Sequence, residues 1–176
     1  IPKIMRHAAE LVTQGKVFRC DLGSFNDKFF TYVAGFGAFT EVSYTTPQEW
    51  KNMLGKTAYF IEGLKHLAEI KPHHMRITYD DGVVEDDFVL GLVSNSVSVA
   101  GYKAYQKEDI KMDDGLFEVL FIRDLKNALE LQEVLNALLT KHLDATKMFR
   151  CSSRHLHIVS DDEVQWTLDG SEAKRS

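Results

Sequence analysis

Cysteine and long apolar runs are scarce in this sequence of 176 residues. Its two cysteines, Cys20 and Cys151, cannot form a disulfide framework, so we expect each to be a small buried hydrophobic residue in a reducing compartment. No apolar run approaches the roughly 20 residues that a membrane-spanning helix needs, and no signal peptide is visible. The formal net charge is −5, whereas phosphate binding needs a basic stripe, so we expect no nucleic-acid partner.

Short catalytic signatures are missing as well. The sequence contains no Gly-x-Ser-x-Gly elbow, no Gly-x-Gly-x-x-Gly turn and no Gly-Lys-Ser/Thr phosphate loop, so this chain by itself offers no nucleotide cradle. His155 and His157 share one face of a predicted strand, but a zinc site needs a third and a fourth ligand, which favours surface histidines. The chain opens without an initiator Met and ends on a polar tail, so we expect a fragment.

The residues that are present indicate one globular domain over 1–176, with 44% hydrophobic and 27% charged residues. Apolar spacing predicts helices over 3–14, from Thr46 to before Pro72, and over 125–143, the last capped by Asp124. β-branched, aromatic or alternating patterns predict strands over 16–23, 27–44, 75–79, 83–96, 116–122, 147–151, 154–159 and 163–168. The fold class is therefore α+β, with β-sandwich-like antiparallel sheets and packed helices.

Three Asp-Gly pairs raise the question of metal binding or proton transfer. Asp81-Gly82 joins two strand patterns and is explained as a hairpin turn, since both residues are able to take positive φ. Asp114-Gly115 instead enters a strand from an irregular loop, where a carboxylate beside free backbone carbonyls suits a hard cation, although a simple turn is the commoner use. Asp169-Gly170 ends an alternating strand, a usual place for a catalytic group.

The order of several short motifs carries a family resemblance. These are "AAELVTQGKVFRCDLGSFNDKFFTYVAGFGAFTEVSY", "LGKTAYFIEGLKHL", "LGLVSNS", "MDDGLFEVLFI" and "WTLDG". Each is weak alone, but together and in this order the chain resembles the C-terminal half of the bacterial diacylglycerol kinase and related lipid kinase family. The resemblance implies the C-terminal, lipid-side domain of a two-domain kinase whose N-terminal domain, with a Gly-Gly-Asp-Gly-Thr motif, is absent here.

Function, cofactors and partners follow from that resemblance. It implies transfer of the ATP γ-phosphate to diacylglycerol or a similar lipid hydroxyl, with structural and catalytic Mg²⁺ and with ATP bound mainly by the missing domain. The enzyme would be cytoplasmic, peripheral at the inner membrane face, where it meets its lipid, and the family also allows a homodimer. This fragment alone would be inactive. Two alternatives stay open: an NAD-kinase-like enzyme with another acceptor, and a non-catalytic lipid- or partner-binding module.

The resemblance also implies site residues. A structural Mg²⁺ would be held by the Asp114 carboxylate and by the backbone carbonyls of Lys111 and Leu116. Asp169 and a following Glu would be catalytic, the Glu as proton acceptor. Here Ser171 occupies the family's Glu position and Glu172 comes one residue later. Either the loop shifts to present Glu172, or the group is lost.

Overall fold

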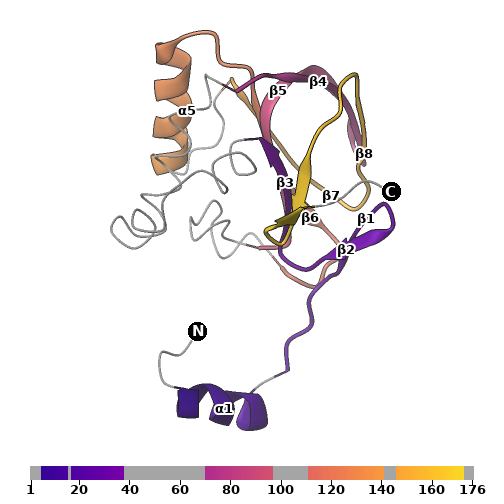
Figure 1. Ribbon diagram of the computed structural model, residues 1–176, viewed down its shortest axis with the longest axis vertical. Coiled ribbons are helices and arrows are strands. Elements are labelled where there is room, and N and C mark those ends of the chain that lie inside the picture. The colour runs from indigo at the N-terminus through magenta and orange to yellow at the C-terminus, as the bar shows by residue number, and fades with distance from the viewer. Residues whose placement is uncertain (1–4, 16, 38–69, 97–110, 141–145, 173–176) are drawn as a thin grey trace.

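The computed structural model describes residues 5–15, 17–37, 70–96, 111–140 and 146–172. Its elements are α1 (Met5–Gln14), β1 (Gly23–Phe25), β2 (Lys28–Phe30), β3 (Val33–Gly37), β4 (His73–Tyr79), β5 (Gly82–Ser94), β6 (Phe117–Arg123), α5 (Ala128–Thr140), β7 (Met148–Ser153), β8 (His157–Ser160), β9 (Trp166–Leu168) and β10 (Ser171–Glu172). β1 and β2 form a hairpin, and the other strands form one antiparallel sheet. The predicted α+β, sandwich-like class is confirmed (Figure 1).

Strand β5 organises the sheet because it changes partners along its 13 residues. Its first half pairs with β4, from Tyr79 opposite Gly82 to His73 opposite Phe88. Its second half lies between β3 and β6, with Ala34 opposite Val93 on one side. The register with β6 shifts between Phe88 and Leu90, an irregularity that bends a strand and increases its twist. β5 is therefore common to both parts of the sheet.

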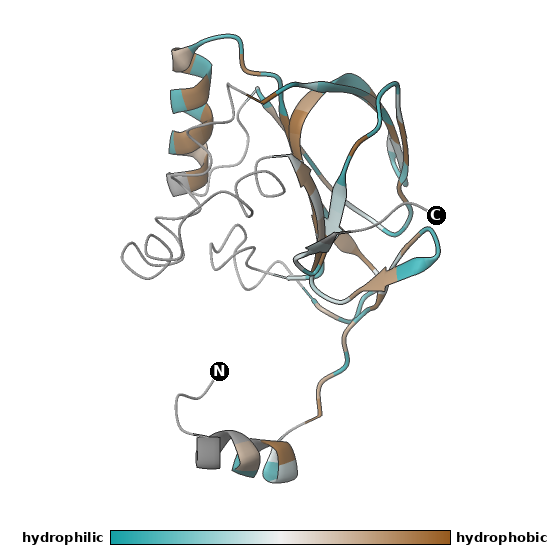
Figure 2. Cartoon of the chain, viewed as in Figure 1, coloured by the Kyte–Doolittle hydropathy of each residue, from teal (hydrophilic) through white to brown (hydrophobic). Residues whose placement is uncertain are grey.

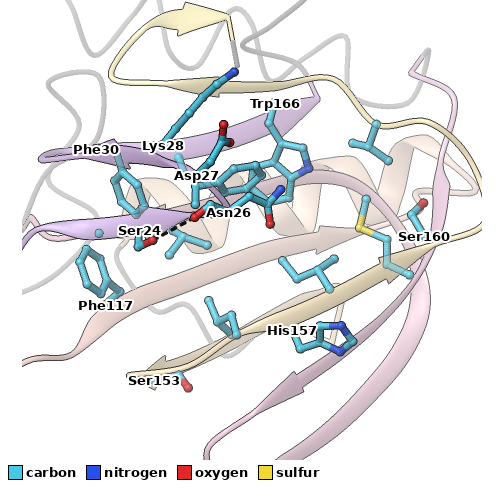
Figure 3. A pocket seen from close by; sticks show the side chains of 18 of the residues that line it. Ser24, Asn26, Asp27, Lys28, Phe30, Phe117, Ser153, His157, Ser160 and Trp166 are labelled. Atoms are coloured by element: carbon cyan, nitrogen blue, oxygen red, sulfur yellow. Dashed lines mark hydrogen bonds between the residues drawn. The ribbon is translucent and has the colours of Figure 1, made fainter. Parts of the chain in front are cut away.

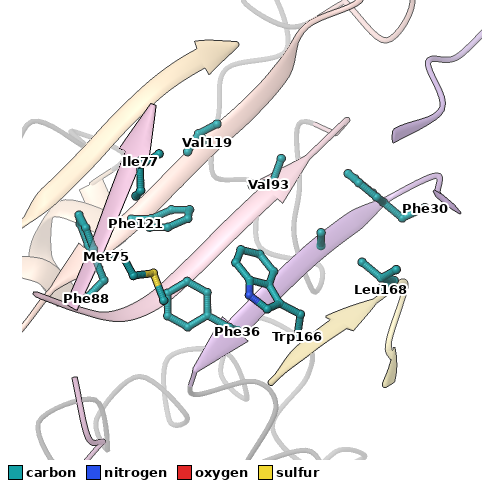
Figure 4. Packing of buried hydrophobic residues seen from close by; sticks show 11 residues of the cluster. Phe30, Phe36, Met75, Ile77, Phe88, Val93, Val119, Phe121, Trp166 and Leu168 are labelled. Carbon is teal, nitrogen blue, oxygen red and sulfur yellow. The ribbon is translucent and has the colours of Figure 1, made fainter. Parts of the chain in front are cut away.

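One face of the sheet encloses an aromatic core. Side chains from β2, β3, β4, β5, β6 and β9 meet there, and Figure 4 shows the cluster: Phe30, Ala34, Phe36, Met75, Ile77, Phe88, Val93, Val119, Phe121, Trp166 and Leu168. Phe36 lies at its centre, with ring centroids 4.9 Å from Trp166 and 5.4 Å from Phe121. Offset and edge-to-face aromatic pairs of this kind add stabilisation beyond the burial of their area.

Helix α5 packs on the opposite face. In β6, Val119 and Phe121 belong to the aromatic core, whereas Leu120 and Ile122 contact the cluster that includes Val134 and Leu138 of α5. This alternation is the period-two pattern of a strand buried on both sides. Figure 2 shows α5 with apolar and polar residues interleaved, as expected for a helix with one buried face.

The start of α5 differs from the prediction. Asn127, rather than Asp124, caps the helix: its Oδ1 accepts hydrogen bonds from the N–H groups of Leu129 and Glu130, both at 3.0 Å. Asp124 instead pairs with Lys126. The helix therefore begins at Ala128, because Asn127 satisfies its first N–H groups.

Several strand predictions near the N-terminus were wrong. Residues 17–22 form no strand, and the β-branched and aromatic pattern there belongs to exposed Val17 and Phe18, which are 95% and 84% accessible. Cys20 is exposed rather than buried. Cys151 is half-buried, and burial raises the pKa of its thiol to about 12. The predicted strand 27–44 is broken at Thr31 into β2 and β3.

The predicted helix 3–14 is confirmed over Met5–Gln14, but almost all of the second predicted helix lies outside the described residues. The hairpin between β4 and β5 is confirmed, but its turn is Asp80-Asp81, because Gly82 already pairs with Tyr79. Positive φ occurs among the described residues elsewhere, including 89° at Gly37, where a Cβ would lie 2.1 Å from the Val89 carbonyl oxygen. The backbones of β3 and β5 therefore lie close together at Gly37. None of the described helices is long and apolar enough to cross a bilayer.

Candidate functional site

Polar side chains from distant parts of the chain converge at one end of the sheet, where β3 and β6 begin and β5 and β9 end. We call this region the polar rim and define it by six residues: Asp21, Thr31, Tyr32, Asn95, Asp114 and Asp169. Strand ends are where functional side chains gather, since the sheet holds them rigidly while leaving them accessible. Two predicted site residues, Asp114 and Asp169, are therefore brought to the same end of the molecule.

Asp169 clamps the junction between β2 and β3. Its Oδ2 accepts hydrogen bonds from the Thr31 N–H at 2.8 Å and the Thr31 hydroxyl at 3.0 Å. Its Oδ1 accepts from the N–H groups of Tyr32 at 2.8 Å and Val33 at 2.9 Å. The Asp169 N–H in turn donates to the Val33 carbonyl at 2.8 Å. With φ of 51°, Asp169 adopts a left-handed conformation that few residues other than glycine and Asn/Asp take.

These four hydrogen bonds also set the charge state of Asp169. Burial raises the pKa of its carboxyl, but the N–H groups of Thr31, Val33 and Tyr32 and the Thr31 hydroxyl lower it by more, so the pKa lies below the ordinary aspartate value. Asp169 is therefore ionised near neutral pH and a weak base. Its geometry suits positioning of the turn that leads to Ser171.

Asn95 links that clamp to the segments on either side. The residue is 1% exposed, and its N–H donates to the Tyr32 carbonyl at 3.2 Å. Its side-chain Nδ2 donates to the backbone carbonyls of Asp21 and Met112, each at 3.1 Å. Its Oδ1 is buried and has no hydrogen-bond partner among the described residues. A buried acceptor without a donor is costly, so this oxygen is free to accept a hydrogen bond from a bound water or another group.

The loop before β6 completes the rim. The Asp21 N–H donates to the Met112 carbonyl at 2.7 Å, and Asp21 Oδ2 accepts from the Gly115 N–H at 2.7 Å. Asp114 Oδ1 accepts from the Leu116 N–H at 3.1 Å, which folds the loop back on itself. Gly115 has φ of 74°, so its freedom to take positive φ is required for this turn. A chain of hydrogen bonds thus runs from Asp169 through Tyr32, Asn95 and Asp21 to this loop.

Oxygen donors dominate this loop. Asp114 and Lys111 are exposed and Leu116 is half-buried, so the predicted cation ligands lie in one short, accessible segment. Within the described ranges, no group of three or more His, Cys, Asp or Glu residues could hold a metal ion. A site of one carboxylate and several backbone carbonyls is not a cluster of that kind. Such all-oxygen donor sets fit hard cations such as Mg²⁺. The Asn95 amide that carries the unpaired oxygen contacts this loop through its Nδ2, which donates to the Met112 carbonyl at 3.1 Å.

The segment after Asp169 is a short hairpin. Gly170 has φ of 83°, and β10 pairs Ser171 with Leu168 and Glu172 with Thr167. The backbone of Glu172 therefore lies next to the strand that ends at Asp169. This places the backbone of both predicted carboxylate residues in one turn.

The remaining predicted residues lie away from the rim. His155 and His157 are exposed, as the surface interpretation predicted, and the described residues contain no metal cluster that includes them. Asp80, in the β4–β5 turn, accepts hydrogen bonds from the N–H groups of Arg154 at 2.8 Å and His155 at 3.3 Å. The Asp80 carboxylate thus connects the β4–β5 turn to the loop between β7 and β8.

Sequence reasoning missed Asn95 and Asp21 as site residues. Both stand inside motifs that carry the family resemblance, "LGLVSNS" and "FRCDLG", so a signal was available. The pattern gives no sign, however, that the Asn95 amide bridges carbonyls of residues 21 and 112, because such a contact depends on the packing of three separate segments.

The fold and the rim together define a class: a β-sandwich domain with a carboxylate-bearing end. A family model described as "YegS C-terminal NAD kinase beta sandwich-like domain" matches residues 33–175. The chain belongs to this family.

Curated relatives and solved structures agree with that assignment. The chain is 29% identical to a diacylglycerol kinase of Staphylococcus epidermidis, over 97% of this chain and 54% of the relative. It is 30% identical to one of Staphylococcus saprophyticus, over 97% and 55%. A crystal structure assigned as a diacylglycerol kinase of Bacillus anthracis has a TM-score of 0.75 at 25% identity, over 97% of this chain and 56% of that one.

The chain thus spans about half the length of the relatives that it matches. The resemblance to a C-terminal domain of the diacylglycerol kinase family, drawn from the sequence, is confirmed. The names of these relatives describe the full-length proteins, of which this chain matches about half.

Proposed function

We propose that this chain is the lipid-side domain of a kinase that transfers the γ-phosphate of ATP to diacylglycerol or a similar lipid hydroxyl. The observation that carries the proposal is the polar rim, in which two predicted site segments share one hydrogen-bond chain within a domain of this family. The ATP phosphates would be held mainly by a second domain, as part of the intact protein. The lipid would be met at the inner face of the membrane, and a homodimer is compatible with this arrangement.

Phosphoryl transfer requires positioned phosphates, a cation that neutralises charge, and a carboxylate that accepts the hydroxyl proton. For the last role we propose Glu172, with Asp169 as the residue that positions it. The oxygens of Asp169 already accept four hydrogen bonds, whereas a general base needs a free lone pair. Ser171, at the family's Glu position, would then mark a one-residue shift in the presentation of the base.

The proposed structural Mg²⁺ would lie on the loop before β6. Asp114 would supply a carboxylate oxygen, and Lys111 and Leu116 backbone carbonyls. When bound, the cation would fix the loop that Gly115 and Asp21 hold against Asn95. Thermal unfolding with and without millimolar magnesium tests this, since a ligand that binds only the folded state raises stability. Asp114→Ala should abolish the rise and Asp81→Ala, in the β4–β5 turn, should retain it.

A kinase assay on the intact protein tests the reaction. With ATP and magnesium, diacylglycerol should be phosphorylated, and this chain alone should show no turnover. In the intact protein, Glu172→Gln should lower kcat by about 10²–10⁴-fold, the usual contribution of a general base. Glu133→Gln, on the exposed side of α5, is the matched control. Phosphorylation of NAD and of no lipid would favour the NAD-kinase-like alternative, and no phosphorylated acceptor at all would favour a binding module.

A further inference from the structure

A cavity of about 530 Å³ opens on the face of the sheet opposite α5. Its size lies within the range of roughly 300–1,000 Å³ that is usual for ligand pockets. Figure 3 shows its two sides: residues 24–28 of the β1–β2 hairpin on one, and His157 of β8 on the other. The polar rim does not line it, so this cavity is separate from the site proposed above.

The inner part of the cavity is apolar. Phe30, Met75, Val93 and Trp166 line it, and each is at most 8% exposed. Phe117 forms part of the wall, with its ring centroid 5.3 Å from that of Phe30. A space with aromatic and aliphatic walls favours a hydrocarbon group, because such a group leaves water on entering it.

The mouth of the cavity is polar, and the side chains of Arg154 and His157 there lack partners among the described residues. The Arg154 N–H donates to Asp80, but its exposed guanidinium makes no hydrogen bond or ion pair within the described part of the chain. The same holds for the exposed His157 imidazole. Asp162, also at the mouth, is neutralised by Lys71 at 2.6 Å. Arg154 is therefore a cation that an anionic group could pair with in bidentate fashion.

The wall also offers a hydrogen-bond donor. The indole N–H of Trp166 has no acceptor among the described residues, although a buried tryptophan usually finds one. The Trp166 ring is fixed between Phe25 and Phe36, with centroids 5.1 and 4.9 Å away. It therefore presents a rigid apolar surface and a donor that a ligand oxygen could use.

We infer that this cavity binds a single-chain amphiphile with an anionic head, its hydrocarbon chain between Trp166 and Phe117 and its head at Arg154. Fatty acids and phosphorylated single-chain lipids share this chemistry. A neutral two-chain lipid, the proposed kinase substrate, does not.

Trp166 provides the test, because the sequence has two tryptophans and Trp50→Phe leaves only this one. The chain with Trp50→Phe is titrated with sodium dodecanoate and with dodecyl phosphate, both below their critical micelle concentrations. Each arm should give a saturable change in Trp166 emission, and the tighter probe identifies a carboxylate or a phosphate head as preferred. Dodecyltrimethylammonium, with the same chain and a cationic head, should bind at least about tenfold more weakly.

Two variants locate the ligand. Arg154→Glu should weaken both anionic probes by about tenfold or more, as expected for loss of a charge-assisted bond. Arg19→Glu makes the same change at an exposed arginine outside the cavity and should leave binding unchanged. Ala34→Phe should fill the cavity and abolish the saturable change in Trp166 emission. Because Arg154 is exposed, Arg154→Glu should fold and can test the inference even if Ala34→Phe fails to fold.

Three outcomes would overturn the inference: no saturable change with either anionic probe, equal affinity for the cationic probe, or unchanged binding in Arg154→Glu. The readout is binding rather than phosphorylation. Failure here therefore leaves the proposed kinase role intact, and failure of the kinase assay leaves this site intact.

Discussion

Two aspartates that follow strands, Asp80 and Asp169, make the same kind of hydrogen bonds, but the network around Asp169 extends further. Each accepts hydrogen bonds from backbone N–H groups of another segment: Asp80 from Arg154 and His155, and Asp169 from residues 31–33. The Asp80 clamp stops at the loop between β7 and β8. The Asp169 clamp continues through Asn95 and Asp21 into the loop before β6.

The difference shows that a carboxylate at a turn is not by itself a functional signal. Hydrogen bonding lowers the carboxyl pKa in both cases: at Asp80 chiefly through the Arg154 N–H, and at Asp169 through residues 31–33, which outweigh burial. What separates them is the buried Asn95, which joins three segments and whose Oδ1 has no partner in the part of the chain that the structure describes. The polar rim therefore differs from the Asp80 turn in the hydrogen bonds that connect its segments, and not in the charge of its aspartate.

The largest expected effect comes from Asp169→Asn. The new amide would set N–H donors against the N–H groups of residues 31–33, leaving some of them unsatisfied. We expect a loss of about 2–4 kcal/mol in the free energy of unfolding, since hydrogen bonds to a charged group are among the stronger ones. Urea unfolding measures it, with Asp27→Asn in the β1–β2 turn as the control. A loss no greater than that of the control would mean that the clamp does not hold the fold.

Asn95→Leu should rank second. It removes the N–H donors to the Asp21 and Met112 carbonyls and leaves an apolar side chain there, and we expect a loss of about 1–3 kcal/mol in the free energy of unfolding. Asn136→Leu on the exposed side of α5 is the matched control and should be close to neutral. Stability equal to that of the parent in Asn95→Leu would contradict the assignment of Asn95 as the link between segments.

Acid should distinguish the parent from Asp169→Asn. The folded-state pKa of Asp169 lies below the ordinary value, so its contribution to stability is present above the unfolded-state pKa and is lost as pH falls through the folded-state pKa. The parent should therefore lose stability on acidification over about pH 5 to 2, and Asp169→Asn should show a shallower loss. Parallel curves for the two proteins would be evidence against an ionised clamp.

The smallest expected effect is that of Asp80→Asn. It should lower Tm less than Asp169→Asn, because fewer N–H groups depend on this carboxylate. Amide hydrogen exchange sharpens the contrast. Asp80→Asn should speed exchange at Arg154 and His155 only, whereas Asp169→Asn should also speed it at Asn95. Faster exchange confined to residues 31–33 in Asp169→Asn would show that the two clamps have the same reach.

Much of this fold could be predicted because its strands bury regular patterns. The alternation in 75–79 indicated a half-exposed strand, and the apolar run of β6, interrupted only by Glu118 before Arg123, indicated a buried one. The same reasoning wrongly predicted a strand at the exposed Val17 and Phe18. β-propensity shows only that a segment suits a sheet, not that a partner strand is present.

The candidate site was less accessible to prediction. The Asp-Gly pairs drew attention to Asp114 and Asp169, because turns and sites share those residues. Asn95 was not predicted as a site residue, because its role depends on the carbonyls of residues 21 and 112, which meet only in the folded chain. A short buried polar side chain at the end of an apolar strand is the signal to seek in such sequences.

The shared strand β5 has a consequence for the order of folding. Its first half pairs with the strand that immediately precedes it, so that hairpin can form from neighbouring residues. Its second half needs β3, and β3 in turn needs β9, whose residues lie near the other end of the chain: Ala34 pairs with Leu168. Closing such long loops is slow, so the end of the sheet that carries Asp169 should be the last part of the molecule to assemble and the first to open.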